Sequence, residues 1–192
     1  VILALLAANK EAAMAKVENE ALPLEYAINN GFSDEVILAL LKANKDAAKV
    51  RGCRGLPLYE AICNMLSNEV VLAVLAANED AAKERGFYAL PLHQAIRAKY
   101  PDGVIFAILA AHKYATMAKD ASKVLPLSLA VSNKLSNEVI LALLAANTEA
   151  VKTKDEDGLL PLGNAIRNQL SDEVILALFA ANEEAAKAKD NN

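Results

Sequence analysis

The sequence predicts an all-α protein whose short helices repeat along the chain. The segment Val-Ile-Leu-Ala-Leu-Leu recurs with small changes every 34 or 35 residues, in copies that begin at Val1, Val36, Val70, Val104, Val139 and Val174. A second marker, Leu-Pro-Leu, keeps the same phase at residues 22–24, 56–58, 90–92, 125–127 and 160–162. Glycine and proline account for only 7 and 6 of the 192 residues, which disfavours a turn-rich β protein. A fixed period of this length is typical of helical repeat arrays.

Each marker proline predicts the start of a short first helix, because the first helical position needs no backbone N–H. An alanine follows four residues after each proline, and we expect these alanines to face a neighbouring helix. They are Ala27, Ala61, Ala95, Ala130 and Ala165.

A second helix is expected after each first helix, with a serine at its start and an asparagine at its end. The predicted N-caps, whose hydroxyls would accept from free backbone N–H groups, are Ser33, Ser67, Ser136 and Ser171. Within this helix the spacing of Val36, Ile37, Leu40 and Leu41 predicts one broad apolar face, with Lys42 pointing away from it. Asparagine tolerates the left-handed backbone that ends a helix, and can also cap the brief third turn expected over the following Glu/Asp-Ala-Ala segment. The asparagines at this position are Asn9, Asn44, Asn78, Asn147 and Asn182.

Two short helices in each 34- or 35-residue unit resemble the ankyrin repeat family. Residues 155–166, Asp-Glu-Asp-Gly-Leu-Leu-Pro-Leu-Gly-Asn-Ala-Ile, are similar to the family's Asp-x-x-Gly-x-Thr-Pro-Leu-His-x-Ala-Ala. The chain departs from that pattern, since leucine replaces the threonine in every copy and the histidine is present only as His93. The resemblance implies an all-α, ankyrin-like helical repeat solenoid of about five and a half repeats. Tetratricopeptide and other two-helix solenoids are the alternative, although the chain lacks their tryptophan.

We expect residues 1–192 to form a single ankyrin-like repeat domain, with units that start near 1, 36, 70, 104, 139 and 174. Terminal units of repeat arrays normally carry polar outer faces. The last unit instead keeps Ile175, Leu178 and Phe179 as apolar as any interior copy. The sequence therefore predicts a segment of a longer array, or ends that partner subunits cover.

Charge and composition restrict the classes of partner. The net charge of −4 offers no basic surplus for phosphates, so we expect no nucleic-acid partner. The longest apolar runs are far shorter than the roughly 20 residues that span a bilayer, so no transmembrane segment is expected. Two cysteines, Cys53 and Cys63, favour free thiols in a reducing intracellular compartment, and the sequence indicates no more specific location.

Few residues are suited to catalysis. The only histidines are His93, which occupies the family's structural position, and His112, which replaces a helix-ending asparagine. Neither cysteine has a histidine nearby in the pattern, and the segment Arg51–Gly55 is interpreted as a solvated hairpin tip in preference to an anion site. We therefore expect no enzyme activity, no cofactor and no metal.

The family resemblance implies that a partner protein is held by the hairpin tips and by variable residues late in the first helices. Carried over by position, the candidate partner-binding residues are Asn29, Asn30, Asn64, Arg97, Ser132, Asn133, Arg167 and Asn168. The predicted function is thus a non-catalytic protein–protein interaction module or scaffold, whose partner the sequence does not identify.

A large apolar residue also occupies one outward position of the second helix, roughly 130° from the centre of the apolar face. The residues of this candidate outer ridge are Leu38, Leu72, Phe106, Leu141 and Leu176. Either the alanine-rich third turn folds back and covers them, or they dock on a partner. The second alternative corresponds to a structural subunit permanently built into a large assembly.

Overall fold

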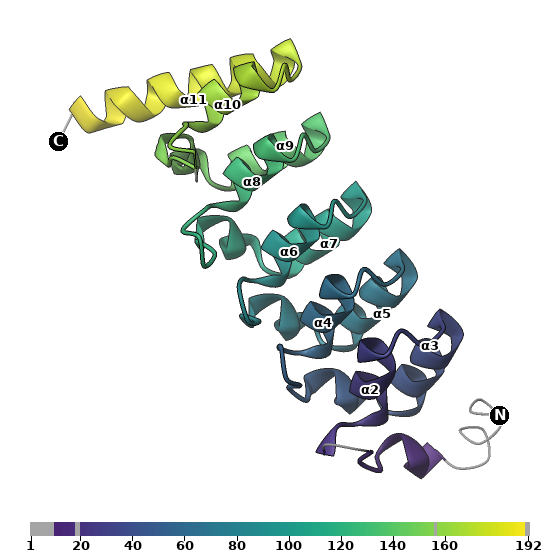
Figure 1. The fold of residues 1–192 in the computed structure, drawn as a ribbon. Coiled ribbons are helices and arrows are strands. Elements are labelled where there is room, and N and C mark those ends of the chain that lie inside the picture. The colour runs from purple at the N-terminus through teal and green to yellow at the C-terminus, as the bar shows by residue number, and fades with distance from the viewer. Residues whose placement is uncertain (1–9, 18–19, 156, 191–192) are drawn as a thin grey trace. The chain divides into compact units, whose positions relative to one another are not determined.

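The computed structural model describes residues 10–17, 20–155 and 157–190, and every regular element in these ranges is a helix. The chain divides into two compact units, Val1–Gln94 and Ala95–Asn192, and the boundary in the sequence falls within helix α6 (Pro91–Arg97). In each unit, pairs of short helices stack in series (Figure 1). The predicted all-α helical repeat class is confirmed. None of the described helices is long and apolar enough to cross a bilayer.

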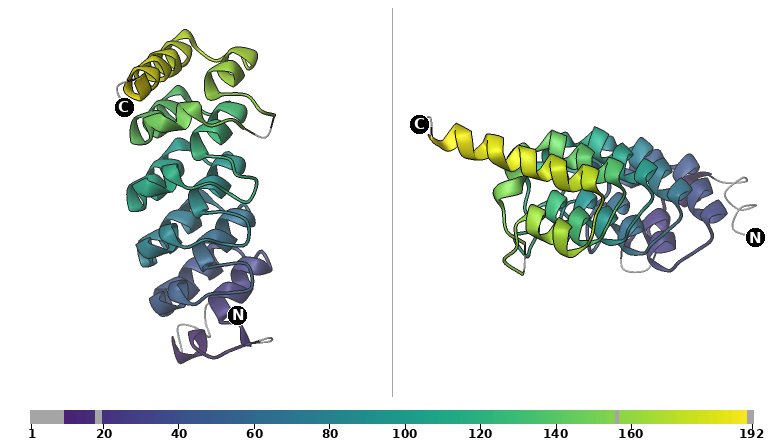
Figure 2. Two further views of the ribbon diagram at one scale, coloured as in Figure 1. Left: turned by 90° about the vertical axis from the view of Figure 1, so that its left-hand side faces the viewer. Right: turned by 90° about the horizontal axis from the view of Figure 1, so that it is seen from above.

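The first unit contains two complete helix pairs. Its elements, before the start of α6, are η1 (Lys10–Ala13), α2 (Pro23–Asn29), α3 (Asp34–Ala43), η3 (Lys45–Lys49), α4 (Pro57–Cys63), α5 (Asn68–Ala77) and η4 (Glu79–Lys83). Helix α2 packs on α3 and α4, and α5 packs on α3 and α4. The first helices thus form one layer and the second helices a parallel layer (Figure 2).

The second unit repeats this arrangement. After the end of α6 its elements are α7 (Asp102–Ala111), η5 (Lys113–Met117), α8 (Pro126–Ser132), α9 (Asn137–Ala146), η6 (Thr148–Lys152), α10 (Pro161–Arg167) and α11 (Asp172–Asp190). Helix α8 packs on α9 and α10, and α11 packs on α9 and α10.

The first helices begin where the sequence predicts. All five start at the marker proline, at Pro23, Pro57, Pro91, Pro126 and Pro161. The five alanines four residues later are completely buried. A larger side chain at these positions would force adjacent helices apart.

The second helices begin one residue after the predicted serine caps. Ser33 occupies the capping position, but its hydroxyl accepts no capping hydrogen bond, so that part of the prediction is wrong for Ser33. The other serine hydroxyls accept from the backbone N–H of the residue three positions on, in the pairs Ser67–Val70 (3.3 Å), Ser136–Val139 (3.2 Å) and Ser171–Val174 (3.4 Å). Ile37, Leu40 and Leu41 are buried as expected, and Lys42 is exposed.

The asparagines after the second helices have a different role from the predicted one. Asn44, Asn78 and Asn147 have φ of −142°, −152° and −153°, so the left-handed prediction is wrong, and their side chains cap no following turn. Each side-chain amide instead donates to a backbone carbonyl of the preceding repeat, at Ala13 (3.3 Å), Ala48 (3.0 Å) and Thr116 (2.8 Å). These asparagines therefore link neighbouring repeats. Asn9 lies outside the described residues, and α11 continues past Asn182, so no helix ends there.

The left-handed residue lies at the end of each first helix. The next residue's N–H reaches back to the carbonyl of the buried alanine, as Leu66 does to Ala61 at 3.1 Å, which is the Schellman arrangement. Only one of the five left-handed residues that end the first helices is glycine, which explains why the pattern is not visible in the sequence. They are Gly31, Met65, Lys99, Lys134 and Gln169, with φ of 54–65°.

The predicted third turns are present as the short 3₁₀ helices η3 to η6, and a hairpin loop joins each of them to the next first helix. The length of the hairpin loop accounts for the difference between the 34- and 35-residue spacings. In 34-residue copies the hairpin closes across four residues, with Gly52 N–H donating to Gly55 O and Gly86 N–H to Ala89 O. In 35-residue copies it closes across five, in the pairs Val17–Ala21, Asp120–Val124 and Asp155–Leu159.

Candidate binding surface

The predicted partner-binding residues lie at the ends of the first helices, beside the hairpins, and six of them line two grooves. Groove A, in the first unit, has a volume of about 670 Å³. Its lining residues are Glu20, Ala21, Glu25, Tyr26, Asn29, Asn30, Arg51, Gly52 and Cys53. Groove B, in the second unit, has a volume of about 290 Å³. Its lining residues are Arg97, Val124, Leu129, Ser132, Asn133, Asp155, Asp157 and Arg167.

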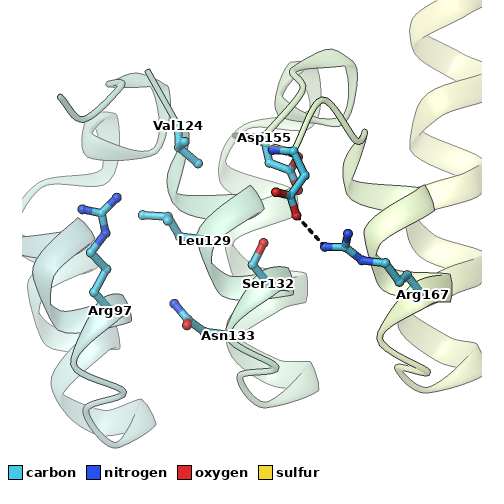
Figure 3. A pocket seen from close by; sticks show the side chains of 8 residues that line it. Arg97, Val124, Leu129, Ser132, Asn133, Asp155 and Arg167 are labelled. Atoms are coloured by element: carbon cyan, nitrogen blue, oxygen red, sulfur yellow. Dashed lines mark hydrogen bonds and ion pairs between the residues drawn. The ribbon is translucent and has the colours of Figure 1, made fainter. Parts of the chain in front are cut away.

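Groove B brings together side chains from three successive first helices. Arg97 extends from α6 on one side and Arg167 from α10 on the other, with Ser132 of α8 between them (Figure 3). The hairpin before α10 adds Asp155 and Asp157. The groove therefore presents two guanidinium groups and two carboxylates around a small apolar floor.

Arg97 is held in place by a buried carboxylate. Its guanidinium forms an ion pair with Asp120, whose side chain is fully buried, while the Arg97 side chain is 32 % exposed. The other Asp120 oxygen accepts from the backbone N–H of Val124 at 2.9 Å. Arg97 is therefore only partly exposed, and its charge neutralises a buried carboxylate.

A second polar network, the Asn164 network, ties α10 to its hairpin and to α8. The buried amide of Asn164 donates to Asp155 Oδ2 at 2.8 Å and to Ser132 Oγ at 2.7 Å. Its oxygen accepts from Arg167 (3.2 Å) and Asn168 (2.9 Å). Asn168 also donates to the carbonyl of Val131 at 3.1 Å, so this predicted residue links two repeats.

The equivalent arrangement in the first unit is the Glu60 network. The carboxylate of Glu60, which is completely buried, accepts from Asn29 Nδ2 (3.0 Å) and from the backbone N–H of Arg54 (3.2 Å). The Arg54 guanidinium in turn donates to the side-chain oxygens of Asn29 (2.8 Å) and Asn64 (2.9 Å). Asn64 donates to the carbonyl of Ile28 at 3.1 Å, as Asn168 does to Val131.

Burial dominates the electrostatics of Glu60. It raises the pKa of the carboxyl above its ordinary value of 4.5, and the nearby Glu25 carboxylate raises it further, against the opposing bonds from Arg54 and Asn29. Glu25 also accepts from the backbone N–H of Cys53 at 3.3 Å. One ligand atom each of Glu25, Cys53 and Glu60 lies within 4.8 Å of the others. In this mixed oxygen–sulfur set the Glu60 oxygens already accept three hydrogen bonds, including one from the Cys53 thiol at 3.8 Å.

The residues considered for nucleophilic or acid–base chemistry differ in burial and position. His93 is completely buried in α6, and His112 is the residue after α7. Burial raises the pKa of the Cys63 thiol, which lowers the fraction of reactive thiolate near neutral pH.

The outer-ridge positions differ in exposure. Leu38 and Leu141 are half-buried, whereas Leu72 and Phe106 are each 37 % exposed and Leu176 is 65 % exposed. The alanines of the third turns are themselves buried, as Ala47 and Ala48 illustrate, so the turns leave part of the ridge accessible.

Sequence reasoning missed Glu60, Arg54 and Asn164 as members of these networks. Asp155 was visible as part of the resemblance to the family's turn, but its partner Asn164 was not, since no pattern marks that position as polar in every repeat.

No model of a known protein family matches the sequence, and a search of curated proteins finds none that is significantly similar.

Proposed function

We propose that the chain is a non-catalytic protein-interaction module, built from ankyrin-like repeats, that binds a partner protein through the first-helix and hairpin face. The observation that carries this proposal is groove B, where Arg97, Ser132, Asn133 and Arg167 line one depression. These positions vary between repeats, while the prolines and buried alanines around them recur.

The chemistry of groove B suits a polar protein surface. Arg167 is the residue best placed to contact a partner, because both side chains of its ion pair with Asp157 (3.0 Å) are at least half exposed. Exposed pairs of this kind contribute little to stability, so the arginine can exchange partners at small cost. Arginine is also among the residues that most often dominate binding energy at protein interfaces.

The test compares two charge reversals in an affinity purification from the native source. Arg167→Glu changes groove B, and Lys42→Glu makes the same change of charge on α3, in the layer of second helices. We expect a stoichiometric partner that the wild type and Lys42→Glu retain and Arg167→Glu loses, with equal melting temperatures. Retention of every partner by Arg167→Glu would contradict the proposal.

The second candidate function is a structural subunit that docks through its second helices. The exposed ridge residues, Leu72 in the first unit and Phe106 and Leu176 in the second, favour this alternative, since exposed large apolar side chains can mark interaction surfaces. A partner lost on Leu72→Glu or Leu176→Glu, but kept by Arg167→Glu, would support it over the groove.

A further inference from the structure

A second pocket of the first unit has a composition unlike either groove. It has a volume of about 470 Å³ and is lined by Cys53, Arg54, Tyr59, Cys63, Phe87, Tyr88 and Gln94. Three of these residues are aromatic and one is cationic. We call it the aromatic pocket.

Two aromatic side chains of this pocket are unusually exposed. Phe87 is 68 % exposed and Tyr88 is 56 % exposed, and their rings pack edge to face with centroids 4.6 Å apart. Both lie in the four-residue hairpin that begins at Gly86. Exposing two neighbouring aromatic rings to water is unfavourable, and such pairs commonly serve as contact area for a partner.

The hairpin that carries these rings is held by specific bonds. The buried hydroxyl of Tyr59 accepts from the backbone N–H of Tyr88 and from Gln94 Nε2, both at 3.1 Å. The guanidinium of Arg85 donates to the carbonyl of Tyr88 at 3.2 Å. A loop fixed in this way presents its side chains at a low entropic cost of binding.

The wall that Arg54 contributes is cationic, since Arg54 is the one charged side chain among the lining residues of the pocket. The Arg54 guanidinium donates to the amide oxygens of Asn29 and Asn64, and these bonds hold it beside the buried Glu60 carboxyl, whose pKa burial raises. Arg51 lies outside the pocket lining, where its guanidinium donates to the carbonyl of Arg85 and forms an exposed ion pair with Glu84 at 3.8 Å. A ligand that complements this wall carries negative charge.

We infer that the aromatic pocket binds an acidic peptide segment of a partner protein, with a bulky apolar side chain between Phe87 and Tyr59 and an adjacent carboxylate facing Arg54. This inference rests on the proposed protein-binding function and specifies the partner's chemistry at a different place in the chain. A peptide is favoured over single-stranded nucleic acid because the pocket offers one aromatic pair and the chain has a net charge of −4.

The experiment selects ligands and then tests their dependence on the pocket. A phage-displayed library of random heptapeptides is selected on the whole chain and counter-selected on Phe87→Ala. We expect enrichment of peptides in which a bulky apolar residue adjoins aspartate or glutamate. Enrichment of basic peptides, or no enrichment, would overturn the inference.

The most enriched peptide is then synthesised with a fluorescent label, and its affinity is measured by polarisation. We expect Phe87→Ala and Arg54→Gln each to weaken binding at least fivefold, whereas Tyr114→Ala, which removes an aromatic side chain 61 % exposed in the second unit, leaves it unchanged. Unfolding curves confirm that the variants fold, and if Arg54→Gln does not, the affinity of the wild type must fall with rising salt concentration. Equal binding by Phe87→Ala, or displacement of the peptide by an oligothymidine, would overturn the inference.

A second readout locates the bound peptide without any change to the pocket's aromatic residues. In Cys53→Ser the remaining thiol, Cys63, lines the pocket, so bound peptide should slow its alkylation. Unchanged alkylation at saturating peptide would place the ligand elsewhere. The proposed function is contradicted by a different result, namely retention of every partner by Arg167→Glu. Failure of this inference and failure of the proposed function are therefore distinguishable.

Discussion

The Glu60 and Asn164 networks occupy equivalent positions in two repeats but distribute charge in opposite ways. In the first unit, helix α4 supplies the carboxylate and the hairpin supplies Arg54. In the second unit, the hairpin supplies the carboxylate of Asp155 and helix α10 supplies the donors Asn164 and Arg167. The contact between hairpin and first helix therefore requires matched donors and acceptors, but not a fixed direction of charge. The hairpin before α4 consequently carries cationic side chains, and the hairpin before α10 carries carboxylates.

The length of the hairpin differs for a related reason. An added Cβ at Gly52 would lie 2.3 Å from a Glu25 oxygen, and one at Gly86 would lie 2.3 Å from the Tyr59 ring. In these four-residue hairpins the glycine makes space for a large side chain from the preceding first helix. In the two five-residue hairpins of the second unit the equivalent residue is Asp120 or Asp155, whose own carboxylate accepts from the loop's backbone N–H groups.

The largest effect is expected at Gly86. Gly86→Ala should lower the free energy of unfolding by about 1–3 kcal/mol, because the new methyl group overlaps the buried Tyr59 ring. The matched control is Gly103→Ala in α7, where no atom lies within 4 Å of the new methyl and alanine should stabilise the helix by about 0.5–1 kcal/mol. Urea unfolding of both variants measures the difference. Equal stabilities would show that the hairpin moves freely away from Tyr59.

The second effect tests the aspartate hairpin. Asp155→Ala removes the acceptor of the Asp157 and Leu159 N–H groups and of the Asn164 amide, so we expect a loss of about 1–2 kcal/mol. Asp157→Ala, which breaks only the half-exposed ion pair with Arg167, should cost less than about 0.5 kcal/mol. Thermal unfolding of the two variants provides the comparison. A larger loss of stability for Asp157→Ala than for Asp155→Ala would contradict the assignment of Asp155 as the main hydrogen-bond acceptor of this hairpin.

These contacts also show where sequence reasoning succeeds. Pro57 and Ala61 were placed correctly because a helix start and a small-residue contact depend on local spacing. Asn44 was misassigned because its amide bonds to Ala13, 31 residues away, and a local rule for helix ends contains no such partner. Met65 was missed at its left-handed position because the residue type that usually signals it is absent.

The candidate site was predicted only in part for the same physical reason. The positions of Ser132 and Arg167 follow from the repeat register, which identifies residues late in each first helix. The partial burial of the Arg97 side chain does not follow from the repeat register, because its partner Asp120 lies 23 residues further along the chain. Register thus predicts where a side chain lies, whereas its charge partner depends on a hairpin that varies between repeats.

The third prediction concerns pH. Since burial raises the pKa of Glu60 in the folded state, the folded chain retains this proton at a pH where the unfolded chain has lost it. Stability contributed by the protonated carboxyl is therefore lost as pH rises from about the ordinary value of 4.5 through the raised pKa. Urea unfolding between about pH 5 and 8 should show this decline in the wild type and a smaller one in Glu60→Gln. The exposed Glu138→Gln is the control, and an identical slope in Glu60→Gln would contradict the assignment.

The smallest effect compares the fourth residues of two five-residue hairpins. Gly158 and Lys123 both have the left-handed backbone, with φ of 77° and 66°, which costs a residue with a Cβ more than it costs glycine. Lys123 is exposed, so Lys123→Gly should raise the free energy of unfolding by about 0.5 kcal/mol, after part of the gain is offset by the greater freedom of glycine in the unfolded chain. Gly158→Ala, with no atom within 4 Å of the new methyl, should lower it by about 1 kcal/mol through backbone strain alone. Chemical unfolding of the two variants in parallel measures both signs. Destabilisation by Lys123→Gly would mean that the lysine side chain makes a contact that stabilises the fold by more than the backbone strain costs. The two hairpins would then differ in energetics although they share one backbone geometry.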